Sequence, residues 1–142
     1  MPVANVNLDE VREKPPLPLG QPLTFGFKQP PTLEQSQQPN KKTQQREWNV
    51  KCQLVPLDPQ WLGSGFDYTV YHNWSLAPGA LSSPEASFSI KKFFAIVGFK
   101  WNSDGSFSTE EMSMLRFVGT LKAGKAPNEA FPQLDKVLGP AA

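Results

Sequence analysis

The stretch REWNVKCQLV, residues 46–55, alternates apolar and polar side chains along almost its whole length. The apolar set is Trp48, Val50, Cys52 and Leu54, and the polar set is Glu47, Asn49, Lys51 and Gln53. Successive side chains of a β-strand point to opposite faces of the sheet. The stretch therefore predicts a strand with one face on a core and the other face in solvent.

Three further stretches show the same alternation. YTVYHNWSL, residues 68–76, follows a turn-like segment at 56–65 and predicts a strand that pairs with the first. Its inward set is Tyr68, Val70, His72, Trp74 and Leu76, and its outward set is Thr69, Tyr71, Asn73 and Ser75. PLTFGFK, residues 22–28, and MLRFVGTLK, residues 114–122, predict the other two strands.

The apolar period changes from that of a strand to that of a helix after Ser82. Apolar residues fall on one helical stripe, formed by Ala86, Ile90, Phe93, Phe94 and Val97. Ser82 or Ser83 is the expected N-cap and Gly98 the expected C-terminal cap. Ser108 with Glu111 predicts a capping box for one short helical turn.

Fifteen prolines favour β structure with extended arms over a helical protein. Residues 1–20 predict an extended N-terminal arm, residues 21–122 one compact domain, and residues 123–142 a C-terminal tail that docks on it. The polar segment 29–45 predicts a loop that carries Lys41 and Lys42. The expected fold is mainly β with one α-helix.

Composition limits the classes of protein to which the chain can belong. Formal charge is nearly balanced, so a nucleic-acid site would have to be a local patch. A single cysteine, Cys52, excludes an intrachain disulfide and a multi-thiolate metal site. The first residues do not resemble a signal peptide and no run is long enough for a membrane helix. We expect a cytoplasmic protein with no membrane contact, no metal and no cofactor.

A catalytic site has little support in the sequence. His72 is the only histidine, near Asp67 and Ser75, and no G-x-S-x-G elbow presents a serine nucleophile. The segment GSG at 63–65 leads into a strand, where a phosphate-binding loop would lead into a helix. We expect a non-enzymatic protein, and a hydrolase that depends on His72 is the least favoured alternative.

The outward side chains of the two central strands are the better candidates for a binding site. A single strand of nucleic acid needs an aromatic plane for stacking, polar groups for base edges and cations for phosphates. The candidate residues are Tyr71, Asn73, Asn49, Lys51, Gln53, Arg46, Lys41 and Lys42. The alternation thus predicts that Tyr71 contacts a base while Trp74 belongs to the core.

The predicted order of elements is that of a five-strand OB-like barrel with its helix between the third and fourth strands. The chain also resembles a group of small phage-encoded OB-fold proteins through the layout LDEV, PLPLGQPLTFGF, REWNVKCQLVPLD, YTVYHNWSL, SIKKFFAIVGF and MLRFVGTLK. The resemblance implies single-stranded DNA binding in phage DNA replication or recombination, inside the host cell. It also implies a replication or recombination enzyme as partner, although the C-terminus FPQLDKVLGPAA lacks the acidic tail that often recruits one.

A different class of function remains open. Proline-rich arms lose less conformational entropy on docking than other chains do, so segments 1–20 and 123–142 suit contact with a neighbouring copy or another protein. The alternative is therefore a structural or assembly protein that forms a homo-oligomer through its arms.

Overall fold

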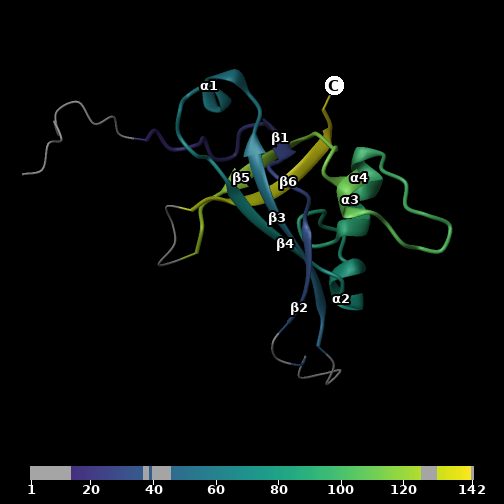
Figure 1. Cartoon of the computed structure of the whole chain (residues 1–142). Helices are drawn as coiled ribbons and strands as arrows, with labels where there is room; N and C mark the ends of the chain where they lie inside the picture. Colours follow the sequence, from purple (N-terminus) through teal and green to yellow (C-terminus); the bar gives the residue numbers. More distant parts are fainter. Residues whose placement is uncertain (1–13, 37–38, 40–45, 126–130, 142) are drawn as a thin grey trace, which may run out of the picture.

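A computed structural model describes residues 14–36, 39, 46–125 and 131–141 of the chain (Figure 1). The described residues form one antiparallel sheet of six strands with a few short helices. This confirms the prediction of a mainly β protein. No helix in these ranges is long and apolar enough to cross a membrane.

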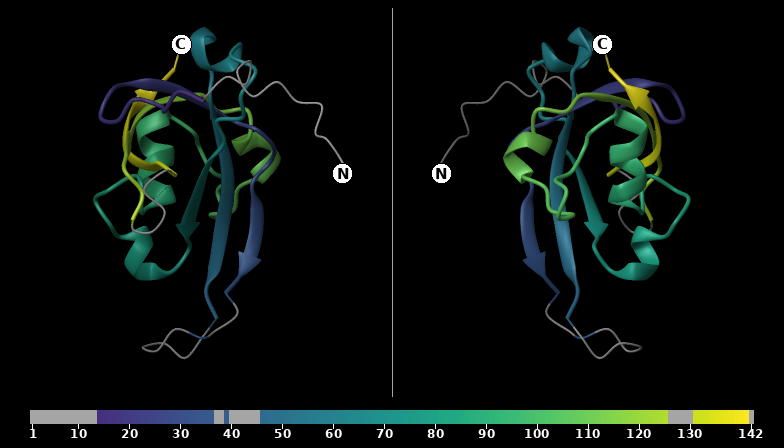
Figure 2. Two further views of the ribbon diagram at one scale, coloured as in Figure 1. Left: turned by 90° about the vertical axis from the view of Figure 1, so that its left-hand side faces the viewer. Right: turned by 90° about the vertical axis from the view of Figure 1, so that its right-hand side faces the viewer.

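The strands of the sheet pair in the order β2-β3-β1-β5-β6, and β4 pairs with the other edge of β3. Their bounds are β1 Leu23–Phe27, β2 Thr32–Gln35, β3 Trp48–Pro56, β4 Val70–Ser75, β5 Phe117–Lys122 and β6 Gln133–Pro140. The first half of β3 pairs with β2 and its last residues pair with β1. Figure 2 shows β2 and β3 running side by side toward one end of the molecule.

The four strands predicted from alternation are β1, β3, β4 and β5, each within a few residues of the expected bounds. Two strands were not predicted. β2 forms inside the polar segment 29–45, which we expected to be a loop throughout, and β6 forms inside the C-terminal tail. The tail is therefore part of the sheet, because β6 pairs with β5 from Gln133 to Pro140.

The sheet is not closed, so the OB-like five-strand barrel that we expected is not confirmed. Among the described residues β4 and β6 approach each other without forming a hydrogen-bonded ladder. Part of the N-terminal arm lies beside this gap: the Tyr68 hydroxyl donates to the Pro15 carbonyl at 2.6 Å, and Leu17 is buried. The Gly20 amide donates to the Leu121 carbonyl at 2.9 Å. The described end of the arm is thus docked on the sheet, while residues 1–13 lie outside the described ranges.

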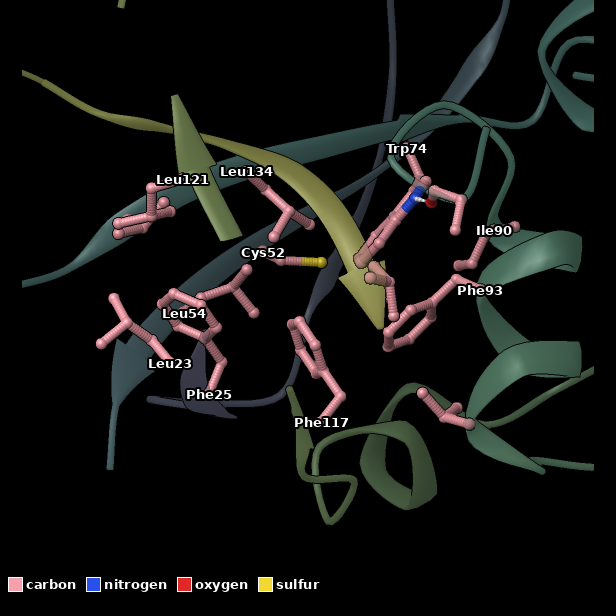
Figure 3. Packing of buried hydrophobic residues seen from close by; sticks show 14 of the residues in the cluster. Leu23, Phe25, Cys52, Leu54, Trp74, Ile90, Phe93, Phe117, Leu121 and Leu134 are labelled. Carbon is pink, nitrogen blue, oxygen red and sulfur yellow. Dashed lines mark hydrogen bonds between the residues drawn. The ribbon is translucent and has the colours of Figure 1, made fainter. Parts of the chain in front are cut away.

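The hydrophobic core lies between the inner face of the sheet and the helix α3, Ile90–Val97 (Figure 3). Trp74 of β4 stacks on Phe93 of α3 with ring centroids 4.6 Å apart. Phe117 of β5 meets the edge of Phe93 at 5.1 Å and stacks on Phe25 of β1 at 5.6 Å. This row of rings joins strands from both halves of the sheet to the helix.

The helix predicted from Ser82 onward is shorter than expected. Four short helices are described: α1 Pro59–Leu62, α2 Pro78–Leu81, α3 Ile90–Val97 and α4 Thr109–Met112. The N-cap of α3 is Ser89, whose hydroxyl accepts from the Lys92 amide, so the expected cap at Ser82 or Ser83 is wrong. The Ala86 carbonyl, three residues before this cap, accepts from the Trp74 indole at 2.8 Å.

The expected helix end is confirmed. Gly98 has a φ of +77°, a left-handed conformation that glycine adopts without a steric penalty, and its amide donates to the Phe94 carbonyl. The capping serine of α4 is also confirmed, because the Ser108 hydroxyl accepts from the Glu111 amide.

A second glycine is required by close packing between β5 and β6. A Cβ at Gly119 would lie 2.8 Å from the Lys136 carbonyl oxygen, so no other residue fits without a backbone shift. The register of the two strands shifts beside this glycine. Gly119 therefore lets β6 pack closely against β5.

Candidate nucleic-acid interface

Five of the predicted binding residues lie on one face of β3 and β4. Residues directly opposite each other in an antiparallel pair share a face, and the register pairs Asn49 with Ser75, Lys51 with Asn73, and Gln53 with Tyr71. We call this surface the outer face, formed by Asn49, Lys51, Gln53, Tyr71, Asn73 and Ser75. The alternate residues Val50, Cys52, Leu54, Val70 and Trp74 are buried, so the predicted division is confirmed for them. Trp48, which we expected on the same inward face, is 49% exposed at the first residue of β3, so that prediction is wrong.

Tyr71 is the aromatic residue of the outer face and is 69% exposed. Because Tyr71 lies on a paired strand, its backbone is already ordered before a ligand binds. Gln53 lies directly opposite on β3 and places an amide beside the ring. The pair offers one stacking surface with hydrogen-bonding groups next to it.

An amide pair crosses the strands on the same face. Asn73 Nδ2 donates to Asn49 Oδ1 at 3.1 Å. This bond fixes the orientation of both side chains, and among the described residues the Asn73 oxygen has no donor. The outer face therefore carries polar groups at defined positions.

The cation in the centre of the outer face is paired with an acid. Lys51 Nζ lies 2.8 Å from Glu34 Oε2, and both side chains are more than half exposed. Glu34 belongs to β2, which the sequence did not predict, so its place beside Lys51 was missed. The segment TLEQ is too short and too polar to signal a strand.

A second ion pair lies at the far end of the same region. Lys28 Nζ lies 3.4 Å from Asp67 Oδ2 and donates to the Thr69 hydroxyl at 3.2 Å. Hydrogen bonds from Thr69 hold the pKa of Asp67 below its usual value, and Lys28 adds to the effect. Lys51 and Lys28 are thus each paired with a carboxylate, which reduces the positive charge in this region.

Arg46 lies beside the outer face at the start of β3. Its Nε donates to the Ser36 carbonyl at 2.6 Å. It lines a polar depression of about 550 Å³ together with Glu34, Gln35, Ser36, Asn49 and Lys51. The other two predicted cations, Lys41 and Lys42, fall outside the described residues.

His72 lies on the inner side of β4, away from the outer face. Its ring meets the edge of Trp74 at 4.3 Å, and its Nε2 is out of contact with solvent and has no hydrogen-bond partner among the described residues. Burial lowers the pKa of His72 to about 4; a hydrogen bond to the Ser87 backbone opposes this shift, and the charge of Lys122 adds to it. No carboxylate within the described ranges is hydrogen-bonded to the ring, so the geometry of a catalytic triad is not formed there.

Cys52 is buried among the core residues, and burial raises the pKa of its thiol to about 12. Because the thiolate is the reactive form, we expect Cys52 to resist Ellman's reagent at about pH 8 in the native protein. The thiol should react fully once the protein is unfolded in guanidinium chloride. Rapid labelling of the native protein would contradict this burial.

Within the described residues no group of histidine, cysteine and acidic side chains could hold a metal ion. The chain matches no known protein-family model, no curated protein and no solved structure. Its function must therefore be inferred from the geometry of its own surfaces.

Proposed function

We propose that this protein is a non-catalytic OB-like protein that binds single-stranded DNA through the outer face. The pattern of strand pairing supports the OB-like part of the proposal. β1 pairs with β3 and β5, β3 with β4, and β5 with β6, while β4 and β6 lie next to each other. This is the order of a partly open five-strand OB barrel, with β2 as an addition at the edge of β3.

The exposed ring of Tyr71 among amide side chains is the observation that carries the binding proposal. In OB folds the face of the second and third strands contacts oligonucleotides, and β3 and β4 take those places here. Stacking of one base on an aromatic side chain contributes about 1–3 kcal/mol and tolerates any base. Asn73, Asn49 and Gln53 supply donors and acceptors to base edges, and Lys51, Arg46, Lys41 and Lys42 supply contacts to phosphates.

The biological setting rests on the family resemblance. The protein acts in phage DNA replication or recombination, in the cytoplasm of the host cell, and works with an enzyme of that process. Because Lys51 is already paired with Glu34, DNA must displace Glu34 to reach the ammonium group. Binding is therefore expected to weaken only modestly as salt rises.

Replacement of Tyr71 by alanine is expected to weaken binding of oligothymidine by about tenfold, because one stacked base loses its partner. Replacement by phenylalanine keeps the ring and should retain most of the affinity. Fluorescence anisotropy of a labelled oligonucleotide measures both variants. Phe88→Ala removes another exposed aromatic ring, outside the outer face, and should leave affinity unchanged.

Glu34→Gln tests the same site with an effect of opposite sign. It frees Lys51 and removes a negative charge that repels phosphate, so affinity should rise by about fivefold at low salt. Wild-type protein that shows no preference for single strands over duplex would overturn the proposal. If the wild type, Tyr71→Ala and Glu34→Gln bind oligothymidine with equal affinity, the outer face is not the binding site.

A further inference from the structure

Two apolar hollows lie on the helical side of the molecule, and Trp101 lines both of them. The first has a volume of about 370 Å³ and is lined mainly by Leu76, Leu81, Ile90, Phe94, Trp101 and Phe107. The second, of about 420 Å³, shares Phe94 and Trp101 with the first and extends along Gly98, Phe99 and Lys100. We call them together the α3 groove. It lies on the opposite side of the sheet from Tyr71, because α3 packs on the inner residue Trp74.

The α3 groove is apolar inside and basic at its edge. Lys91 lines the first hollow and Lys100 the second, and Lys92 is exposed beside Lys91. The ion pairs found among the described residues are Lys28–Asp67 and Lys51–Glu34, so none of these three lysines has an acidic partner there.

The placement of Lys91 and Lys92 is unfavourable for the isolated helix. They occupy its first turn, which contains no acidic residue. Positive side chains are destabilising at the N-terminus of a helix, where the backbone dipole is itself positive. Asp104 directly precedes Gly105, which lines the first hollow. Its carboxylate already accepts from the backbone amide and the hydroxyl of Ser106. An acidic ligand at this edge would offset the repulsion.

We propose that the α3 groove is the docking site of the N-terminal segment of this chain, residues 3–13, VANVNLDEVRE. The segment carries medium-sized apolar side chains at Val3, Val6, Leu8 and Val11 and acids at Asp9, Glu10 and Glu13. Its acids outnumber its single cation, Arg12, by three to one. An apolar residue followed by two acids, as in Leu8-Asp9-Glu10, matches an apolar hollow edged by Lys91 and Lys92.

The segment is long enough to contact a surface at some distance from Lys14. The described chain begins at Lys14, whose Nζ lies 4.7 Å above the Tyr68 ring. Thirteen residues in extended form span up to about 45 Å. This length is available to the segment for contact with the groove of its own molecule or that of a second copy, and the ligand chemistry is the same in both cases. The inference does not depend on the DNA-binding proposal, because it concerns the other side of the sheet.

The experiment uses the full chain labelled with ¹⁵N and follows the indole resonance of Trp101, assigned with Trp101→Phe. The double variant Leu8→Asn/Val11→Asn removes the apolar contacts and should shift that resonance and increase its exchange with solvent. Addition of a peptide with the sequence of residues 1–13 to the double variant should restore the wild-type position. A peptide in which Asp9 and Glu10 are replaced by lysine should fail to restore it.

Matched charge reversals locate the peptide on the protein. Lys91→Glu, introduced into the double variant, should lower the affinity for the peptide of residues 1–13 by about fivefold or more. Lys136→Glu makes the same change at an exposed position of β6 and should leave the peptide affinity unchanged. Sedimentation of the wild-type protein over a range of concentrations then shows which copy supplies the segment. The inference is overturned if the double variant leaves the Trp101 resonance in place, or if both peptides act equally.

Discussion

Replacement of Trp74 by alanine is expected to destabilise the protein by about 4 kcal/mol, the range for loss of a large aromatic side chain from a packed core. Trp74 is fully buried, stacks on Phe93, and donates its indole hydrogen to the Ala86 carbonyl. The alanine variant loses the ring contacts and leaves a buried carbonyl without a partner. Urea unfolding should show a midpoint lower by about 2 M.

Two variants separate the contributions to this effect. Trp74→Phe keeps a ring on Phe93 and loses the bond to Ala86, so its cost should be about 1–3 kcal/mol. Tyr71→Ala removes a ring from the same strand but from the exposed side, and should change stability by less than about 1 kcal/mol. A loss in Tyr71→Ala as large as that in Trp74→Ala would mean that the two faces of β4 have been assigned the wrong way round.

Acidification is expected to remove about 3 kcal/mol of stability through His72 alone. The pKa of His72 is about 4 in the folded protein and 6.5 in the unfolded chain, so the unfolded chain binds a proton first as the pH falls. The stability is therefore present in full above pH 6.5 and is lost as the pH falls from 6.5 to 4. Urea unfolding at several pH values measures this slope.

The variant His72→Gln should abolish the slope, because glutamine does not titrate. The exposed carboxylates of Asp67 and Asp104 do not interfere in this window. Hydrogen bonds, chiefly from Thr69 and Ser106, lower the pKa values of these two carboxylates below 3.8. The stability that they contribute to the folded protein is therefore lost only below the window in which His72 titrates. A slope between pH 6.5 and 4 that persists in His72→Gln would assign the effect to other groups.

The sequence predicted those parts of the fold whose own side chains determine their structure. Alternation along residues 46–55 and 68–76 predicted β3, β4 and the division between buried Trp74 and exposed Tyr71. The glycine cap at Gly98 was equally local, because it depends on one residue and its backbone conformation.

The remaining features depend on partners distant in the sequence. The segment before α3 is joined to β4 by the bond from the Trp74 indole to the Ala86 carbonyl, and no local pattern reveals that bond. β2 forms because the edge of β3 is available for pairing, although its own residues are all exposed. For the same reason the sequence placed Lys51 in the candidate site but did not reveal that Glu34 neutralises it.

The position of β1 has a consequence for the time course of folding. β1 joins the two halves of the sheet: Phe25 pairs with Pro56 on one side and with Phe117 on the other. The second pairing closes a long loop, and such non-local contacts slow folding. During synthesis on the ribosome, β1 and β3 can pair early, but the pairing of Phe25 with Phe117 forms only after β5 has been synthesised. We therefore expect the nascent chain to expose this ring until β5 has emerged.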